Sequence, residues 1–537
     1  MSIIMKHIVT AALILGPLAS GQLVWPSKWD ELEDIYTMQA GYHRQGFSDS
    51  VNPCTFGGSV QGRQNSAEWI RTAFHDMAAH DATAGTGGID ASIFFELQRG
   101  ENAGSAFNNT FAFFYGYHSV RASASDLIAL GVVTASSACR GPKVEFRAGR
   151  IDANKAGAAG VPEPSTSLAK TTVTFRKAGF SKQDMIAMVA CGHTLGGVHS
   201  ADFPEIVKIP ADPNNDTNVP FQKDVSNINN GVVTEFLQGT TKNPLVVASN
   251  NTLNSDKRIF NADRNFMKKL ANKETFQATC GSIFTRMIDT VPKNVKLTDI
   301  APYDVKPYVD ELSVNKNGDM SFKGRVRLRT TKGAGRNADD LAVKLVYADN
   351  KGKGQTVITA KRATFQSGST TGLNGEQFVS FEFDATIKAK SGISKFWIQE
   401  TVPSTKKTKT HDNQGSGGYP VQDTVLLQLP ESCLNTDAVV NNQVPLSITA
   451  MVREEQASNP LTLKVVHKVP RKGVIVPQLK TELVQFKATR KKKNGWVAYR
   501  AQTKVTDFTT YDIVLGGKTR KVVDFKKTVE LPSSCPR

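Results

Sequence analysis

Beyond its first residues, the 537-residue chain lacks any hydrophobic run long enough to cross a membrane. One apolar run, Ile8 to Leu18, follows a lysine and precedes the small residues Ala19, Ser20 and Gly21. That order is typical of a secretory signal peptide, and the run is too short for a membrane-spanning helix. We therefore expect residues 1–21 to be a signal peptide and the mature protein to be secreted, soluble and not membrane-bound.

Cysteine is scarce, and the six present suit an oxidising compartment. The four in the first half allow three pairings, and the two in the second half could pair with each other; spacing decides neither case. The cysteines are Cys54, Cys139, Cys191, Cys280, Cys433 and Cys535. Three N-x-Thr sequons, at Asn108, Asn215 and Asn250, agree with secretion and predict a glycoprotein.

Acidic residues are under-represented only in the second half of the chain. From Ala301 onward there are 38 Lys and Arg against 22 Asp and Glu, so this half carries nearly all of the net charge of +17. A secreted chain makes nucleic acid an unexpected partner. The basicity therefore predicts either a module that docks on an anionic cell-wall polysaccharide or lignin-like polymer, or a spacer packed on the first half.

The pattern of apolar residues changes near residue 300. Before it, helical segments alternate with polar, Gly-rich loops, and Ser165–Ala178 is one predicted helix with Ser165 as its N-cap. After it, short runs alternate apolar and polar residues, which is typical of antiparallel sandwiches. We predict a mainly α-helical domain at 22–300, followed by β-sandwich domains at 305–435 and 436–537.

No nucleophile elbow or phosphate-binding loop is present, but the octet Trp69 to Asp76 places an unusual set of side chains together. In a helix, Arg71, Phe74 and His75 stand at i, i+3 and i+4 and project from one face. A core-facing helix would carry aliphatic residues there. The alternative is an Arg and a His at the edge of a half-buried helix; the chemical interpretation is a pocket in which Arg71 polarises an oxygen compound and His75 deprotonates it.

A second candidate stretch runs from Met185 to His199. An apolar helix there ends in Gly-His-Thr-Leu-Gly, which presents His193 at a helix terminus between small residues. Glycine on each side lets a flat group approach the backbone closely. Taken alone, a histidine in this position is more often a structural residue than a ligand.

Together these stretches resemble the plant, fungal and bacterial haem peroxidase superfamily, and most closely its secreted fungal members. The resemblance spans about Trp69 to Val291. The motifs that carry it are Arg71-Thr-Ala-Phe-His-Asp76, Gly87-Gly-Ile-Asp-Ala-Ser92, Ser125-Asp-Leu-Ile-Ala-Leu130, Phe146-Arg-Ala-Gly-Arg-Ile-Asp-Ala153, Gly192-His-Thr-Leu-Gly196 and Asn254-Ser-Asp256.

The resemblance implies a haem b cofactor with His193 as the ligand to its iron. Asp256 would accept the other ring N–H of His193 and raise its basicity. His75 would take a proton from hydrogen peroxide and return it to the departing oxygen, while Arg71 would stabilise the developing charge. Three further residues have implied roles: Asn102 orients the distal imidazole, Phe74 packs over the haem, and Phe221 is the proximal ring.

Calcium is implied as well. Asp76, the backbone of Gly88, Asp90 and Ser92 match the family's distal site, and their hard oxygen donors suit Ca²⁺; the alternative is that they only cap and tether the loop. Thr194 matches the first ligand of a proximal site. At the later ligand positions, where the family has Asp-x-Thr and then Asp, this chain has Gln222, Asp224 and Asn229, so two carboxylates are replaced by amides. We therefore expect this second site to be weak, absent or replaced by direct hydrogen bonds.

The family pattern implies a Cys54–Cys139 bridge, which would leave Cys191 and Cys280 as a second pair that pins the proximal helix. Relatives usually carry four disulfides in this domain, so the cysteine pattern departs from the family.

The expected activity is reduction of hydrogen peroxide coupled to one-electron oxidation of small phenolic or similar aromatic donors. The helical half has no tryptophan after Trp69, so the exposed radical site of lignin-degrading relatives is not expected. Glu31, Glu33 and Asp34 are the acidic residues considered for a manganese site. Other uses of the same haem, as a catalase or peroxygenase, are disfavoured by a distal Arg–His pair. The remaining alternative is a catalytically weak, peroxidase-like protein whose basic β-domains bind an anionic polymer.

Overall fold

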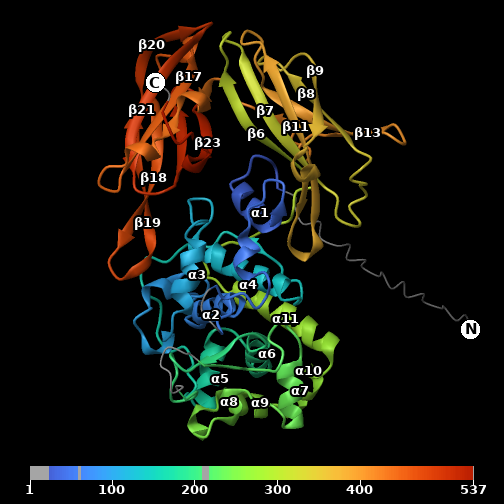
Figure 1. Cartoon of the computed structure of the whole chain (residues 1–537), viewed down its shortest axis with the longest axis vertical. Helices are drawn as coiled ribbons and strands as arrows, with labels where there is room; N and C mark the ends of the chain where they lie inside the picture. The colour runs from blue at the N-terminus through green and yellow to red at the C-terminus, as the bar shows by residue number, and fades with distance from the viewer. Residues whose placement is uncertain (1–22, 59–61, 209–216, 536–537) are drawn as a thin grey trace, which may run out of the picture.

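The computed structural model of the chain describes residues 23–58, 62–208 and 217–535. The predicted signal peptide and the sequon at Asn215 lie outside these residues. Figure 1 shows most of the helices gathered at one end of the molecule and two bodies of strands at the other, with α1 between them. The predicted fold class, a mainly helical part followed by antiparallel β-sandwiches, is confirmed.

The helical half is built from short helices joined by long loops. The helices are α1 (Asp30–Thr37), α2 (Asn65–Ala78), α3 (Ala106–Phe114), α4 (Ala124–Ala138), α5 (Leu168–Lys177), α6 (Lys182–Gly192), α7 (Gly231–Gln238), α8 (Pro244–Val247), α9 (Ser255–Asn261), α10 (Arg264–Leu270) and α11 (Lys273–Ile288). Across the described ranges, no helix is long and apolar enough to span a bilayer.

One predicted helix start is wrong. Helix α5 begins at Leu168 and its N-cap is Ser167, whose side chain accepts the backbone N–H of Lys170, so Ser165 lies outside the helix. Both serines follow the same prolines, and only the one with an N–H three residues ahead in helical geometry can act as the cap. In contrast, α6 begins with a reciprocal capping box, which Ser181 and Asp184 form.

The first β body has two layers. One contains β6 (Val305–Val314), β7 (Met320–Arg329), β11 (Gln377–Ile387) and β10 (Ser369–Thr371); the other contains β9 (Thr356–Arg362), β8 (Ala342–Ala348), β12 (Lys395–Val402), β13 (Lys407–His411) and β14 (Tyr419–Pro420). A short β11–β9 pairing links the layers. The N-terminal β1 (Ala40–Gly41) pairs with β10, so the chain ahead of α2 extends this sheet.

The second β body is a sandwich of two sheets. One sheet contains β15 (Val425–Leu427), β16 (Cys433–Leu434), β17 (Val444–Arg453), β21 (Trp496–Val505) and β20 (Lys487–Lys493); the other contains β19 (Val474–Gln485), β18 (Leu461–Arg471), β22 (Thr510–Leu515) and β23 (Lys521–Lys527). Residues Asn494 and Gly495 form the tight turn between β20 and β21, as their order predicts.

The hydrophobic cores cross the predicted domain limits. The core of the helical half includes Leu373 from the first β body and Val476 from the second. The core of the first β body likewise includes Met451 and Trp496 of the second. The limits at residues 300 and 435 stay predictions about the chain, and the packing joins all three parts.

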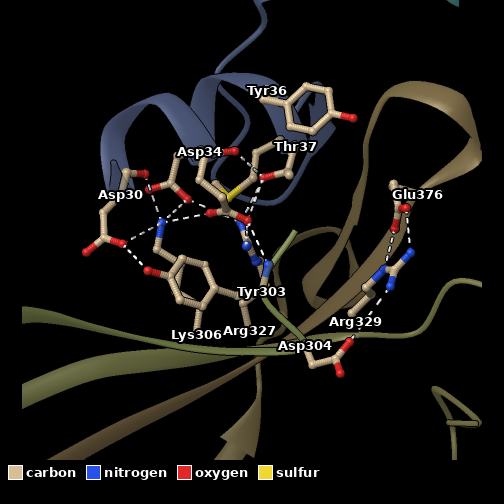
Figure 2. A network of polar contacts seen from close by, with 12 residues as sticks. Asp30, Asp34, Tyr36, Thr37, Tyr303, Asp304, Lys306, Arg327, Arg329 and Glu376 are labelled. Atoms are coloured by element: carbon tan, nitrogen blue, oxygen red, sulfur yellow. Dashed lines mark hydrogen bonds and ion pairs between the residues drawn. The ribbon is translucent and has the colours of Figure 1, made fainter. Parts of the chain in front are cut away.

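Helix α1 is tied to the first β body by a buried ionic network (Figure 2). The ammonium of Lys306 on β6 lies 2.8 Å from Glu33 Oε2 and 2.8 Å from Asp34 Oδ1. The guanidinium of Arg327 on β7 contacts the same two carboxylates. Burial raises the pKa of Asp34, but the charges of Lys306 and Arg327 outweigh it and hold that pKa below its ordinary value.

This network argues against Glu31, Glu33 and Asp34 as ligands of a manganese ion. Glu33 and Asp34 are paired with Lys306 and Arg327, and Glu31 lies 2.7 Å from the ammonium of Lys527. Carboxylates that are already neutralised by buried cations are poor ligands for a divalent ion. These acidic residues therefore form a joint between parts of the chain.

Candidate functional site

A cavity of about 270 Å³ opens between α2 on one side and α6 and α9 on the other. Arg71, Phe74 and His75 line one wall, which we call the distal wall. His193 and Asp256 line the opposite, proximal wall, together with Phe221. The structure therefore brings both predicted histidines to one cavity, although 118 residues separate them in the sequence.

The distal imidazole is held in one orientation. Asn102 Oδ1 lies 2.8 Å from His75 Nδ1, and Asn102 Nδ2 donates to the carbonyl of Glu96 at 3.0 Å. Because the amide nitrogen is engaged as a donor, Oδ1 must accept, and His75 therefore carries its proton on Nδ1. His75 Nε2 is left as an unprotonated base.

Burial sets the charges on the distal wall. Burial and the neighbouring Arg71 together lower the pKa of His75 to about 3, so the ring is neutral at pH 7. Burial also lowers the pKa of Arg71 to about 10, at which the guanidinium stays charged. The Arg71 side chain donates to the carbonyl of Ala103 at 2.9 Å and lies over the ring of Phe107, 4.8 Å from its centroid.

The proximal imidazole is fixed from two directions. His193 is the C-cap of α6, and its Nδ1 lies 2.8 Å from Asp256 Oδ2 at the start of α9. Its ring stacks on Phe221 with centroids 4.1 Å apart and planes 13° from parallel. The Asp256 carboxylate accepts a second hydrogen bond from Asn243 Nδ2 at 2.7 Å. The Asp256 side chain is fully buried. Because Nδ1 of His193 is engaged by this carboxylate, Nε2 is the ring nitrogen that remains for another contact.

Sequence reasoning missed Asn243. Its Oδ1 accepts the N–H of Leu245 and caps α8, while its Nδ2 holds Asp256. The Asn243-Pro244 pair signals a helix start, and that signal identifies the cap. Nothing in the local sequence indicates the second bond, because Asp256 lies on another helix.

Of the predicted distal calcium residues, Asp76 lies on α2, whereas Gly88, Asp90 and Ser92 lie in the segment that follows it. Asp76 accepts the backbone N–H groups of Asp90, Ala91 and Ile93 at 2.8–3.0 Å, and Asp90 accepts that of Ser92 at 3.1 Å. Burial raises the pKa of both carboxylates, and the charge of Asp90 raises that of Asp76 further.

Two buried, mutually repelling carboxylates that form no ion pair with a Lys or Arg of the described residues are the donor set that a bound cation would stabilise. Over the described part of the chain, no group of three or more His, Cys, Asp or Glu side chains is arranged to hold a metal. Further oxygen ligands would be groups other than carboxylates, for which the Gly88 backbone and the Ser92 hydroxyl are the candidates that the resemblance implies. Gly88 itself has φ of +105°, and a Cβ there would lie 2.5 Å from the Thr290 carbonyl.

The predicted proximal calcium position is filled by a side-chain amide. Gln222 Nε2 donates to the carbonyl of Thr194 at 2.8 Å and to that of Asp224 at 2.6 Å, while Oε1 accepts the N–H of Val232 at 2.6 Å. The Thr194 hydroxyl donates to the Cys191 carbonyl instead of facing an ion site. Direct hydrogen bonds, one of the three expected outcomes, occupy this position, and the residues do not fit a second cation.

The disulfides follow the pairing that the resemblance implies. Cys54 is bonded to Cys139 and Cys191 to Cys280, and a third bridge joins Cys433 to Cys535. The second bridge fixes the end of α6, two residues before His193, to α11.

Residues 58–280 match the family described as Peroxidase. A WSC domain-containing protein of Arthroderma benhamiae is 40% identical over 453 residues, covering 79% of this chain and 61% of that protein. L-ascorbate peroxidase 5 of Arabidopsis thaliana is 28% identical over 37% of this chain and 68% of its own length. Manganese peroxidase H4 of Phanerodontia chrysosporium is 31% identical over 26% of this chain and 39% of its own length.

The chain spans about three fifths of the length of the Arthroderma protein. The similarity covers more of the chain than the helical half contains, so it extends into the β-rich half. The matched region encloses both walls of the cavity, with Arg71 and His75 on one side and His193 and Asp256 on the other. The helical part of this chain is thus a peroxidase domain of the superfamily found in plants, fungi and bacteria.

Proposed function

We propose that the chain is a secreted peroxidase that uses a haem b held between its distal and proximal walls to reduce hydrogen peroxide. The observation that carries the proposal is the pair of oriented imidazoles. Asn102 fixes the Nδ1 proton of His75, Asp256 fixes that of His193, and both rings line the same cavity. Each ring therefore has its Nδ1 engaged and its Nε2 turned away from that hydrogen-bond partner.

The residues present fit a haem. The cavity lining is largely apolar, and the ring of Phe221 lies flat against His193. His193 Nε2 would ligate the iron, and the Asp256–Asn243 pair would strengthen that imidazole as a donor. When bound, the haem supplies the electrons that cleave the peroxide O–O bond and then accepts single electrons from a reducing substrate.

The distal residues handle the proton and the charge. His75 Nε2 takes a proton from hydrogen peroxide and returns it to the departing oxygen, a role worth typically about 10²–10⁴ in rate. The charged Arg71, held by Ala103 and Phe107, stabilises the negative charge that develops on that oxygen, worth on the order of 3 kcal/mol. Phe74 completes the wall beside His75 and packs against Phe175.

The reducing substrates that we propose are small phenols and similar aromatic donors. Trp69 is buried against Phe113 and Phe114, and the carboxylates considered for manganese are consumed by ion pairs. Secretion and N-glycosylation remain part of the proposal, and Asn108 and Asn250 are exposed.

Addition of one equivalent of hydrogen peroxide to the purified full-length protein tests the function. The Soret band should shift promptly and return when a phenol is added. A haem band that ignores peroxide would indicate a binding protein built on a peroxidase frame. Absence of haem after supplementation would overturn the assignment of His193.

We also propose one Ca²⁺ per chain, bound by Asp76, Asp90, Ser92 and the Gly88 backbone. Chelation should lower the free energy of unfolding by about 2–3 kcal/mol, because it restores the repulsion between two buried carboxylates. Elemental analysis and thermal unfolding with and without EDTA provide the measurement. Asp90→Asn should bind less calcium and respond less to EDTA, whereas Asp224→Asn, at the amide-filled position, should behave like wild type. Two ions per chain would contradict this assignment.

For the β-rich half, the contacts support a structural role packed on the catalytic domain. Its residues pack into the hydrophobic core of the helical half, and its Lys306 forms ion pairs with the carboxylates of Glu33 and Asp34 on α1. Docking on an anionic polymer stays a prediction. The lysines of β13 are exposed and could contact such a polymer, and a binding assay with the full chain tests this.

A further inference from the structure

We propose that the β18–β19 hairpin of the second β body is a positioning element for the distal wall, so that the C-terminal half sets the geometry of His75. The catalytic consequence of this inference rests on the proposed peroxidase function. The hairpin lies outside the matched peroxidase region, and no residue of it touches the cavity. Figure 1 shows β19 reaching beside α3, and β19 contacts both α3 and the 3₁₀ turn η2 (Ser92–Phe95).

The tip of the hairpin is anchored in the helical half. Val476 is buried in its core, and Val474 and Ile475 pack against that core. Arg471, on the facing strand, donates from Nε to the carbonyl of Val476 at 2.9 Å, which fixes the side chain across the turn. Its guanidinium lies over the ring of Phe95, 4.6 Å from the centroid. The hairpin thus contacts Phe95, the last residue of η2, through the Arg471 side chain.

From Phe95 a short chain of contacts leads to the distal base. The next residue, Glu96, presents the carbonyl that accepts Asn102 Nδ2 at 3.0 Å. Asn102 Oδ1 in turn accepts from His75 Nδ1 at 2.8 Å. A displacement of the Phe95–Glu96 backbone would therefore move the one group that fixes the orientation of the His75 ring. The turn η2 begins with Ser92 and Ile93. The Ser92 hydroxyl and the Ile93 backbone N–H both donate to the Asp76 carboxylate.

A second arm of the same β body supports the other side of the distal wall. Lys468 on β18 donates to the carbonyl of Tyr115 at 3.0 Å, and its ammonium lies 4.3 Å from the centre of that ring. The Tyr115 hydroxyl donates to Asp507 at 2.6 Å. Tyr115 ends α3, and Phe107 on the same helix lies against His75, with centroids 5.0 Å apart.

Both arms act on the segment between α2 and α4, which supplies Asn102 and Phe107, the two residues shown to contact the His75 ring from outside its own helix. That segment has little secondary structure of its own, only η2, η3 (Gly100–Asn102) and α3. Loop segments of this kind are held by what packs on them. The hairpin provides that packing from a distant part of the sequence.

Arg471→Ala tests the positioning role in the full-length protein. Hydrogen exchange of residues 92–102, followed by mass spectrometry, should accelerate several-fold. The second-order rate with hydrogen peroxide should fall about tenfold or more, because small misplacements of a catalytic group are costly, while the rate with a phenol stays near wild type. Lys472→Ala removes the same charge from an exposed neighbour on the same turn and should change neither quantity. Arg471→Lys should recover part of both.

Lys468→Ala removes the hairpin's bond to the Tyr115 carbonyl and provides a second variant if Arg471→Ala does not fold. Unchanged exchange of residues 92–102 in folded Arg471→Ala, or of residues 106–115 in folded Lys468→Ala, would overturn the inference. A peroxide rate and a phenol rate that fall in equal proportion would also overturn it, since that result indicates general loss of folded enzyme. A wild-type protein that ignores peroxide, with exchange still faster in the variants, would reject the proposed function and leave the positioning role standing.

Discussion

His75→Leu is expected to slow the reaction of the haem-loaded protein with hydrogen peroxide by about 10²–10⁴-fold. The variant removes the only unprotonated nitrogen on the distal wall, since burial and Arg71 keep the imidazole neutral and Asn102 holds its proton on Nδ1. Leucine fills a similar volume among Phe74 and Phe107, so the haem should be retained. Stopped-flow absorption at the Soret band measures the rate.

The same substitution at a histidine outside the cavity is the matched control. His411→Leu, on β13, removes an imidazole that is bonded to Glu400 and should leave the peroxide rate unchanged. Asn102→Ala should fall between the two, because it leaves the base in place but frees its orientation. If His75→Leu reacted at the wild-type rate with its haem intact, the distal wall would not be the site of proton transfer.

Much of this site could be predicted because its residues lie in contiguous motifs. Arg71, Phe74 and His75 share a helix face, and helical periodicity alone brings them together. Which residue meets which across the cavity came from the resemblance, and the geometry of Asn102 with His75 and of Asp256 with His193 agrees with it.

The interpretation of sequence is weaker where one residue has two partners. Asn243 reads as a helix cap, and its second bond depends on the position of α9. Gln222 shows the same limit. Replacement of a carboxylate by an amide indicates a weaker ion site, but only the fold shows that the amide nitrogen bonds to two carbonyls in place of an ion.

The joints between the parts of the chain could not be predicted. Lys306 and Arg327 stand in alternating strands, where a basic residue normally faces solvent, yet each is 1% exposed. Val476 stands at the tip of a hairpin, where an apolar side chain has no local partner. Contacts at sequence separations of about 270 to 380 residues leave no periodic signal, so the sequence indicates two separate sandwiches and the structure shows one joined molecule.

Lys306→Met is expected to lower the free energy of unfolding by about 3–5 kcal/mol, the usual cost of breaking a buried ion pair from one side. Lys306 and Arg327 together face Asp30, Glu33 and Asp34, so the variant leaves one cation among three carboxylates. Urea unfolding, followed by far-ultraviolet circular dichroism and by the haem band, gives the measurement. Lys316→Met, an exposed lysine in the β6–β7 turn, is the control and should change stability by less than about 0.5 kcal/mol.

The combination with Glu33→Gln distinguishes charge from packing. If the loss comes from an unpaired buried carboxylate, Lys306→Met with Glu33→Gln should be more stable than Lys306→Met alone.

The dependence of stability on pH has a definite sign. The native pKa of Asp34 lies below its ordinary 3.8, so its contribution is complete above about pH 4 and is lost as the pH falls further. Lys306→Met should reduce this loss of stability at acid pH.

Loss of the haem band together with the β structure in one transition would show that α1 and the β-rich half stabilise the catalytic cavity. Deleting the chain after residue 302 would then unfold the peroxidase domain instead of releasing it, because Glu33 and Asp34 would lose every cation that neutralises them.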